Sequence, residues 1–140
     1  MSVALIESVK RCTQDPSFLD RFQELFLEKD PDIARRFSGM DRARMKFSLS
    51  RSVLLLVKHA ARMPGADAEL ERLATRLGPA GLGIPAGHFP LWMEALLRAV
   101  KEVDRALTPE LEREWREVMT REVDALVNRM YYRSDVRGGP

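Results

Sequence analysis

The sequence predicts an all-α fold, and three observations support this class. Apolar residues recur at helical spacing along almost the whole chain, while the alternating Val, Ile and Thr patterns of strands are missing. A glycine- and proline-rich run at residues 78–85 interrupts the helical pattern. Three further sites place a capping side chain directly before a proline whose fixed φ suits a first helical turn: Asp15-Pro16, Asp30-Pro31 and Thr108-Pro109.

The elements follow in order from these start signals and from the apolar stripes. Each expected helix has one apolar side that faces the core, and polar or glycine-containing segments separate the helices. We expect a first helix at about 3–13, a second carrying Phe18, Phe22, Leu25 and Phe26, a brief turn from 30–31 to near 37, and helices at about 41–62, 67–77, 86–105 and 109–132. Residues 133–140 are expected to form a flexible tail after a single domain of residues 1–132.

Length and composition restrict the possible functions. The 140 residues suit one domain with a real core. The 23 basic and 21 acidic residues alternate in sign along the chain, so nucleic-acid binding is not expected. The densest apolar stretch, residues 53–57, is far shorter than the roughly 20 residues that cross a bilayer. A single cysteine, Cys12, and the lack of a leader pattern predict a protein of the reducing cytoplasm, outside the membrane.

The order of these signals resembles the globin family, specifically the bacterial single-domain globins. The segment from Phe22 to Pro31 is similar to the globin second helix and its proline turn, and Phe37 falls where globins place the phenylalanine that packs on haem. The loop from Gly78 to Pro85 resembles the corner after the haem-bearing helix. The resemblance covers about residues 17–130 and implies a globin-like fold of about six to seven helices in a three-over-three arrangement.

The same resemblance points to a degenerate haem pocket. The proximal histidine, seven residues before the isoleucine of the Ile-Pro corner, corresponds to Leu77, whose side chain has no lone pair for iron. The tyrosine of the second helix corresponds to Gln23. The distal position corresponds to Met45, or to Lys46 if the register shifts by one residue. The residues expected to line the pocket are Phe22, Gln23, Phe37, Met45, Leu49, Leu77, Ile84 and Trp92.

Two readings of this pocket stay open. In the first, haem is not expected as a cofactor, and the chain is a non-haem globin-like domain for sensing, for binding an apolar or fatty-acid-like molecule, or for contacting a signalling partner. In the second, Met45 gives a haem globin atypical coordination, and the protein binds oxygen or another diatomic gas. His59 and His88 are expected to serve packing or to face solvent, and no metal site is expected beyond the Met45 alternative.

Other functions have less support from the residues. No nucleophile lies beside an expected base, so we expect no enzymatic activity. A plain helical adaptor with no pocket and an exposed apolar patch is a third reading. By analogy with globins, a homodimer through the last two helices would involve Trp115, Tyr131 and Tyr132.

Overall fold

The computed structural model describes residues 1–132, and within that range every regular element is a helix. The expected tail, residues 133–140, lies outside the described residues. The all-α prediction is confirmed. The helices are α1 (Val3–Thr13), α2 (Pro16–Glu28), α3 (Pro31–Arg36), α4 (Arg42–Ala60), α5 (Ala66–Leu77), α6 (His88–Val103), α7 (Pro109–Val127) and the π-helix η1 (Asn128–Tyr132).

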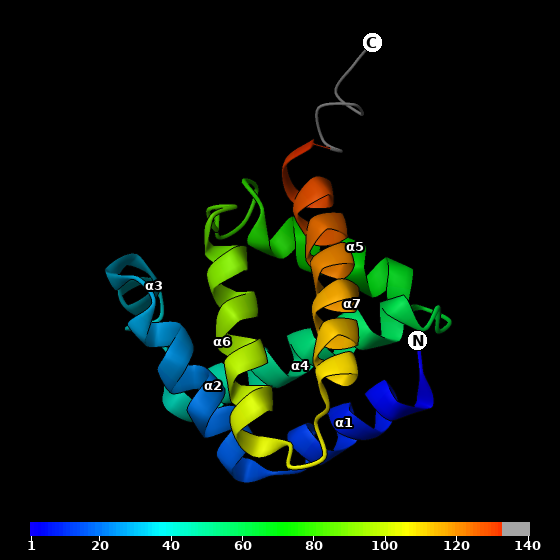
Figure 1. Cartoon of the computed structure of the whole chain (residues 1–140). Helices are drawn as coiled ribbons and strands as arrows, with labels where there is room; N and C mark the ends of the chain where they lie inside the picture. Colours follow the sequence, from blue (N-terminus) through cyan, green and yellow to red (C-terminus); the bar gives the residue numbers. More distant parts are fainter. Residues whose placement is uncertain (133–140) are drawn as a thin grey trace.

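The helices form two crossing layers (Figure 1). Helices α6 and α7 stand nearly upright beside each other, while α1, α4 and α5 run across them. Helix α2 packs chiefly on α6, and α4 contacts α2, α5 and α7. Helices α4 and α5 join through a short turn and diverge toward α3 and the start of α6.

The predicted helix starts are confirmed by their caps. The side chains of Asp15, Asp30 and Thr108 accept hydrogen bonds from backbone N–H groups two or three residues ahead, at 2.9, 2.8 and 3.1 Å. Helix α6 begins at His88, two residues later than expected, so Pro90 is its third residue. An N–H at that position has no acceptor within the helix, and proline is tolerated there.

The end of the last helix differs from the prediction. Helix α7 ends as an α-helix at Val127, and η1 continues it with the wider π geometry. This change coincides with a docking contact, because Met130 is buried and the Tyr131 hydroxyl donates a hydrogen bond to the carbonyl of Ile84. The regular spacing of apolar residues does not predict this change of helix type, because the change depends on where η1 contacts α5 and the loop that follows α5.

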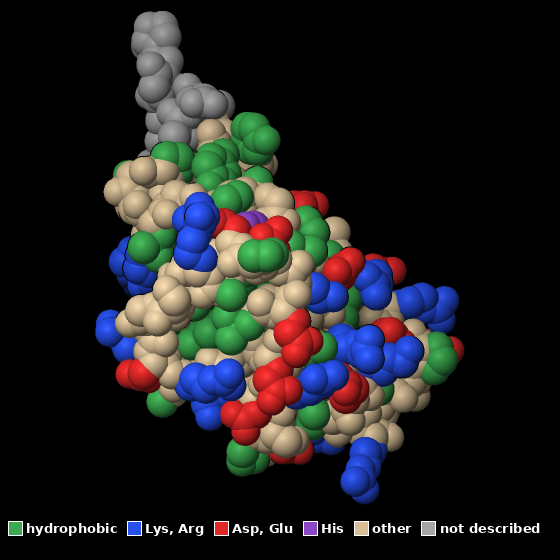
Figure 2. Space-filling view, turned by 90° about the vertical axis from the view of Figure 1, so that its left-hand side faces the viewer, with side chains coloured by type: hydrophobic (Ala, Val, Ile, Leu, Met, Phe, Trp, Pro, Cys, Tyr) green, Lys and Arg blue, Asp and Glu red, His purple; other side chains and the backbone are tan. Residues whose placement is uncertain are grey.

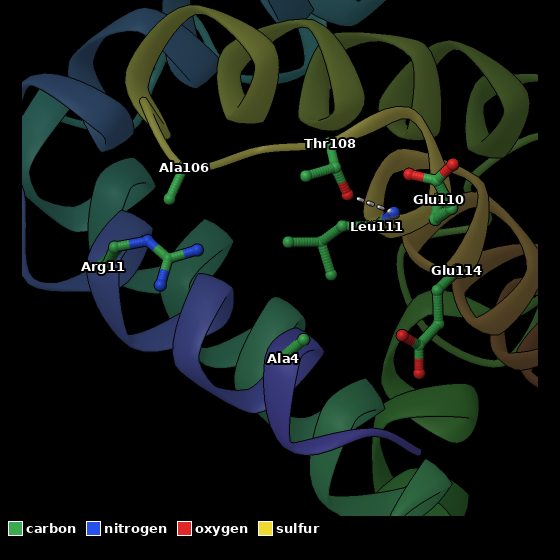
Figure 3. Close-up of a pocket in the computed structure, with 7 residues that line it drawn as sticks. All are labelled: Ala4, Arg11, Ala106, Thr108, Glu110, Leu111 and Glu114. Carbon is green, nitrogen blue, oxygen red and sulfur yellow. Dashed lines mark hydrogen bonds between the residues drawn. The ribbon is translucent and has the colours of Figure 1, made fainter.

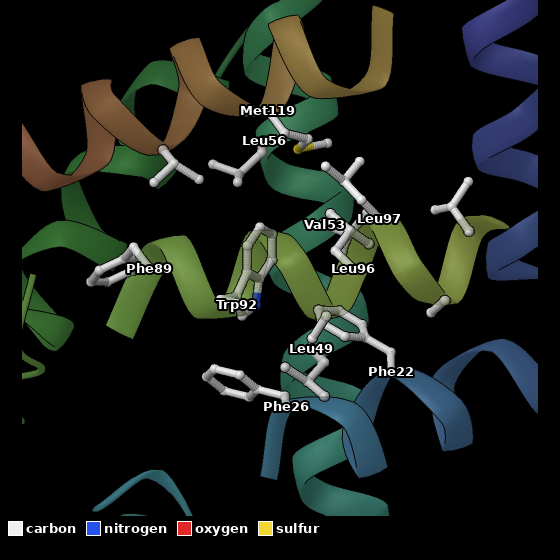
Figure 4. Packing of buried hydrophobic residues seen from close by; sticks show 14 of the residues in the cluster. Phe22, Phe26, Leu49, Val53, Leu56, Phe89, Trp92, Leu96, Leu97 and Met119 are labelled. Carbon is white, nitrogen blue, oxygen red and sulfur yellow. The ribbon is translucent and has the colours of Figure 1, made fainter. Parts of the chain in front are cut away.

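The core lies where α2, α4, α6 and α7 meet (Figure 4). Phe22 packs edge-on against Trp92, with 5.6 Å between the ring centroids, and Phe18 lies next to it. Figure 4 shows Leu49 and Val53 of α4 reaching the same cluster. These contacts fix α6 against α2 and α4, and therefore position Trp92 and Phe89 for the site described below.

The surface carries both signs of charge. On the face shown in Figure 2, Lys and Arg lie among Asp and Glu, with apolar patches between them. This mixture agrees with the alternating signs of the sequence. Among residues 1–132, no helix is both long enough and apolar enough to span a bilayer.

Candidate ligand cavity

A cavity of about 650 Å³ opens between the diverging ends of α4 and α5. This volume lies within the range of roughly 300–1,000 Å³ that is usual for small-molecule sites. Its deep part is apolar and buried, while its mouth consists of exposed side chains. The buried lining residues are Phe26, Met45, Leu49, Leu56, Leu73, His88, Phe89, Trp92, Val123 and Leu126.

The structure brings six of the eight expected pocket residues to this one cavity. They come from four different segments: the end of α3, α4, the end of α5 with its following loop, and α6. Leu77 is the last residue of α5 and a half-buried part of the wall. The six residues are Phe37, Met45, Leu49, Leu77, Ile84 and Trp92.

Phe22 and Gln23 do not line the cavity. Phe22 is fully buried behind Trp92, which stands between it and the open space as part of the cavity wall. Gln23 is also buried, and its side-chain amide donates a hydrogen bond of 3.2 Å to the carbonyl of Arg42. Gln23 therefore ties α2 to the first residue of α4, and it neither points to solvent nor faces a ligand.

The two candidates for the distal position face different ways. Met45 is buried and lines the cavity. Lys46 turns to the outside, where its Nζ lies 2.9 Å from Oδ1 of Asp20 on α2. Of the two registers left open by the sequence, the one with Met45 is therefore the one that faces the cavity.

Arginines dominate the mouth of the cavity. Arg36, Arg44, Arg51, Arg72 and Arg76 line it together with one acidic residue, Glu69. Arg36 is held by Asp32, with 2.8 Å between Nε and Oδ2. The other four arginines are exposed and form no ion pair within the part of the chain that the structure describes. The mouth thus carries an excess of positive charge above an apolar interior.

The two histidines have partners. Nε2 of His88 lies 3.1 Å from Oδ2 of Asp32, and the pKa of that carboxyl is lowered, chiefly by the hydrogen bond from Arg36. His59 lies elsewhere, half-buried between α4, α5 and α7. Its Nδ1 is 2.6 Å from Oε1 of Glu122, and its Nε2 is 3.2 Å from Oδ1 of Asp67. The expectation that His88 serves packing or faces solvent is therefore incomplete, because it is also part of the cavity lining.

The lining does not fit conventional haem ligation. Leu77 at the end of α5 offers only carbon atoms to the cavity. The side chains in the lining that could ligate iron are the thioethers of Met40 and Met45 and the imidazole of His88, and a carboxylate lies against Nε2 of His88. No cluster of three or more His, Cys, Asp or Glu residues suited to a metal ion occurs within residues 1–132. The chemistry of this lining is that of an apolar container with a basic mouth.

A second, smaller hollow of about 340 Å³ lies between α1 and the start of α7 (Figure 3). Its charged residues already have partners. Nε of Arg11 is 2.7 Å from Oδ1 of Asp104, and Glu114 accepts a hydrogen bond of 2.8 Å from the backbone N–H of Ser2. Glu110 pairs with Arg113 at 3.7 Å. This hollow consequently leaves little charge for recognising a ligand.

Behind that hollow lies a buried polar network. The carboxylate of Asp104 accepts hydrogen bonds from Arg11, from the Ser8 hydroxyl and from the backbone N–H of Ala106. The Ser8 oxygen in turn accepts a hydrogen bond of 2.9 Å from Nε1 of Trp115. Burial alone would raise the pKa of Asp104, but these hydrogen bonds outweigh burial and lower it.

The burial of the aromatic residues bears on the expected dimer surface. Trp115 is fully buried in the network, so the suggestion that it contributes to a dimer surface is wrong. Tyr131 is half-buried and its hydroxyl is hydrogen-bonded to the carbonyl of Ile84, while Tyr132 is exposed.

The single cysteine is buried as well. Burial raises the pKa of the Cys12 thiol to about 12, which keeps it from acting as a thiolate nucleophile near neutral pH.

The arginines of the mouth were missed by sequence reasoning, although a signal exists. Arg44 and Arg51 are seven residues apart, two helical turns, and therefore share one side of α4. Arg72 and Arg76 are four apart on α5, and each directly precedes a cavity leucine, Leu73 or Leu77. The balanced overall charge conceals these local groups.

Comparison with known proteins gives one close structural match. A crystal structure from Pseudomonas aeruginosa PAO1, of a protein described as structurally highly homologous to a human haemoglobin, superimposes with a TM-score of 0.83. The two chains are 31% identical over 90% of this chain and 95% of the other. No protein-family model matches the chain, and no curated protein matches it either.

Proposed function

This chain belongs to the globin family, and we propose that it uses the globin scaffold to bind an apolar small molecule without conventional haem ligation. The observation that carries the proposal is the cavity of about 650 Å³ whose deep lining is almost entirely apolar. Leu77 stands where the family resemblance places the proximal histidine, and it forms part of the cavity wall. Binding in such a cavity is favoured by the burial of apolar surface, about 25 cal/mol per Å².

A ligand-binding module of this kind suits a sensory role. The cavity wall is connected to the C-terminal end of the fold, because Tyr131 of η1 donates a hydrogen bond to the Ile84 carbonyl in the wall. A ligand that displaces Ile84 would alter this contact. The proposal therefore includes transmission of ligand occupancy to η1, where a signalling partner could detect it.

A haem titration followed by absorption spectroscopy tests this function against the haem alternative. We expect the purified protein to give no sharp Soret band when haem is added, since Leu77 cannot ligate iron. Leu77→His supplies an imidazole at the wall of the same cavity, and it should create a Soret band. A sharp Soret band in the unmodified protein would contradict the proposal.

The second candidate function is a haem globin that binds a diatomic gas through atypical coordination. The observation in its favour is Met45, a buried thioether in the cavity lining. It predicts a Soret band in the unmodified protein that shifts or disappears in Met45→Ala. Met119→Ala is the matched control, because Met119 is fully buried and lies outside the cavity lining.

A further inference from the structure

We propose that the cavity selects a single-chain amphiphile with an acidic head group, and that four arginines at its mouth bind that head group. This inference rests on the proposed function, which requires only that the cavity takes an apolar molecule. It adds a chemical class of ligand and a binding site for its charged end. The four residues, here called the arginine rim, are Arg44, Arg51, Arg72 and Arg76.

The arginine rim is built by two helices from opposite sides. Arg44 projects from the first turn of α4 and Arg51 from its middle, and Arg72 and Arg76 project from the last half of α5. Because α4 and α5 form an antiparallel pair joined by the short turn 61–65, the first half of α4 lies beside the last half of α5, away from that turn (Figure 1). All four side chains line the same cavity.

The charge of the rim is uncompensated by the protein itself. Within residues 1–132, none of the four guanidinium groups of the rim forms an ion pair, and only one acidic residue, Glu69, lines the mouth. Arg51 lies over the ring of Phe47 at 5.7 Å, a contact that orients the guanidinium and leaves its charge available. By contrast, Arg36 at the same mouth is paired with Asp32.

The deep part of the cavity is unfavourable for a charged group. Phe26, Leu49 and Trp92 line it, and burying a charge among such side chains without a partner is costly. A ligand that satisfies both regions has a long apolar part and an anion at one end only. Guanidinium groups suit a carboxylate or a phosphate because their N–H groups form paired hydrogen bonds with its oxygens.

Two exposed apolar side chains extend the apolar surface to the outside. Phe47 is 63% exposed and Leu82 is 62% exposed, and both belong to the cavity lining. They lie on α4 and on the loop after α5, so they flank the mouth from two segments. Large exposed apolar groups beside an apolar cavity provide contact for the part of an aliphatic chain nearest the head group.

The test compares an acid with its alcohol at equal chain length. Nile red, a neutral apolar dye, is bound to the full chain and displaced by dodecanoate or by dodecanol. We expect both to displace it, with dodecanoate binding about tenfold more tightly, since two exposed ion pairs together are worth about that factor. Raising the salt concentration should reduce this preference, because exposed charges are screened.

Arginine variants locate the preference. Arg72→Gln combined with Arg76→Gln should weaken dodecanoate about tenfold and leave dodecanol unchanged. The matched control combines Arg116→Gln with Arg121→Gln, which removes two exposed arginines of α7 that lie outside the cavity lining. This control should keep the preference for the acid.

Each outcome separates the head-group inference from the proposed function. Equal binding of acid and alcohol, or a preference for the acid that is undiminished when Arg72 and Arg76 are replaced, overturns the head-group inference and leaves the proposed function intact. If neither amphiphile binds, both fail. Haem also combines an apolar body with carboxylates, and displacement by haem at lower concentrations than dodecanoate would overturn the assignment to a single-chain ligand.

Discussion

The cavity between α4 and α5 and the junction of α1, α6 and α7 treat charge in opposite ways. At the junction, the buried carboxylate of Asp104 meets Arg11, Ser8 and a backbone N–H, and every group has its partner. At the cavity mouth, the arginine rim has no carboxylate partner among residues 1–132. A charge that the fold itself neutralises contributes to stability, whereas a charge left without a partner beside a cavity is available for a ligand.

Packing also differs between the two regions: the junction is closely packed, and the cavity wall borders open space. Leu5 of α1 is almost fully buried at the junction, while Leu77 is half-buried on the wall of the cavity. We expect Leu5→Ala to lower the free energy of unfolding by about 3 kcal/mol, because it leaves a void in a close-packed region. Leu77→Ala should cost about 1 kcal/mol, since it enlarges a space that already exists.

Urea unfolding of Leu5→Ala and Leu77→Ala measures both losses of unfolding free energy. Equal losses of unfolding free energy would contradict the distinction between a packed junction and an open cavity wall. The affinity for dodecanol provides a second readout. It should change in Leu77→Ala and not in Leu5→Ala, because Leu77 lines the cavity and Leu5 does not.

The polar network of the junction should give the next largest effect. Asp104→Asn removes the charge that Arg11 and Ser8 share, and we expect a loss of about 2 kcal/mol in unfolding free energy. The matched control is Glu102→Gln. Its exposed carboxylate pairs with Arg21 and Arg98, and its loss should cost under about 1 kcal/mol. A control as damaging as Asp104→Asn would contradict a special role for the buried network.

The pH dependence of stability follows from the lowered pKa of Asp104. A carboxyl whose pKa is lower in the folded than in the unfolded state stabilises the fold above its unfolded pKa, about 3.9. This stabilisation disappears as the pH falls through the folded pKa. The difference in unfolding free energy between the unmodified protein and Asp104→Asn should therefore be largest near pH 7 and shrink in acid. A difference that grows in acid would contradict the sign.

The smallest effect on stability is expected at the arginine rim. Arg72→Gln combined with Arg76→Gln removes no internal ion pair of the described chain, so the unfolding free energy should change by less than about 0.5 kcal/mol. Thermal and urea unfolding check this value. A large loss of stability would mean that these arginines support the fold, and their effect on ligand binding would then need another explanation.

The sequence predicts the fold well because its signals are local. The capping residues Asp15, Asp30 and Thr108 each lie next to the helix that they start, and the apolar stripes specify which side is buried. The change from α7 to η1 was not predictable in this way. It depends on contacts of Met130 and Tyr131 with segments about fifty residues earlier in the chain.

The cavity was predicted in part. Residues that follow the family pattern, such as Phe37 and Trp92, reach it, whereas Gln23 is used to hold α2 against α4. The choice between Met45 and Lys46 needed the direction in which each side chain leaves the helix. The arginine rim combines residues from two helices, and the two pairs lie about twenty residues apart in the sequence, so no short stretch of the sequence shows them together.

The two tryptophans of the chain allow the most direct test, because Trp92 lines the cavity and Trp115 belongs to the junction. A dodecanoate brominated at its last carbon quenches only a tryptophan that it contacts. We predict that its titration quenches the fluorescence of Trp115→Phe, which retains Trp92, and leaves that of Trp92→Phe unchanged. Quenching of Trp115 instead, or no saturable quenching of Trp92, would contradict the account of an apolar ligand cavity between α4 and α5.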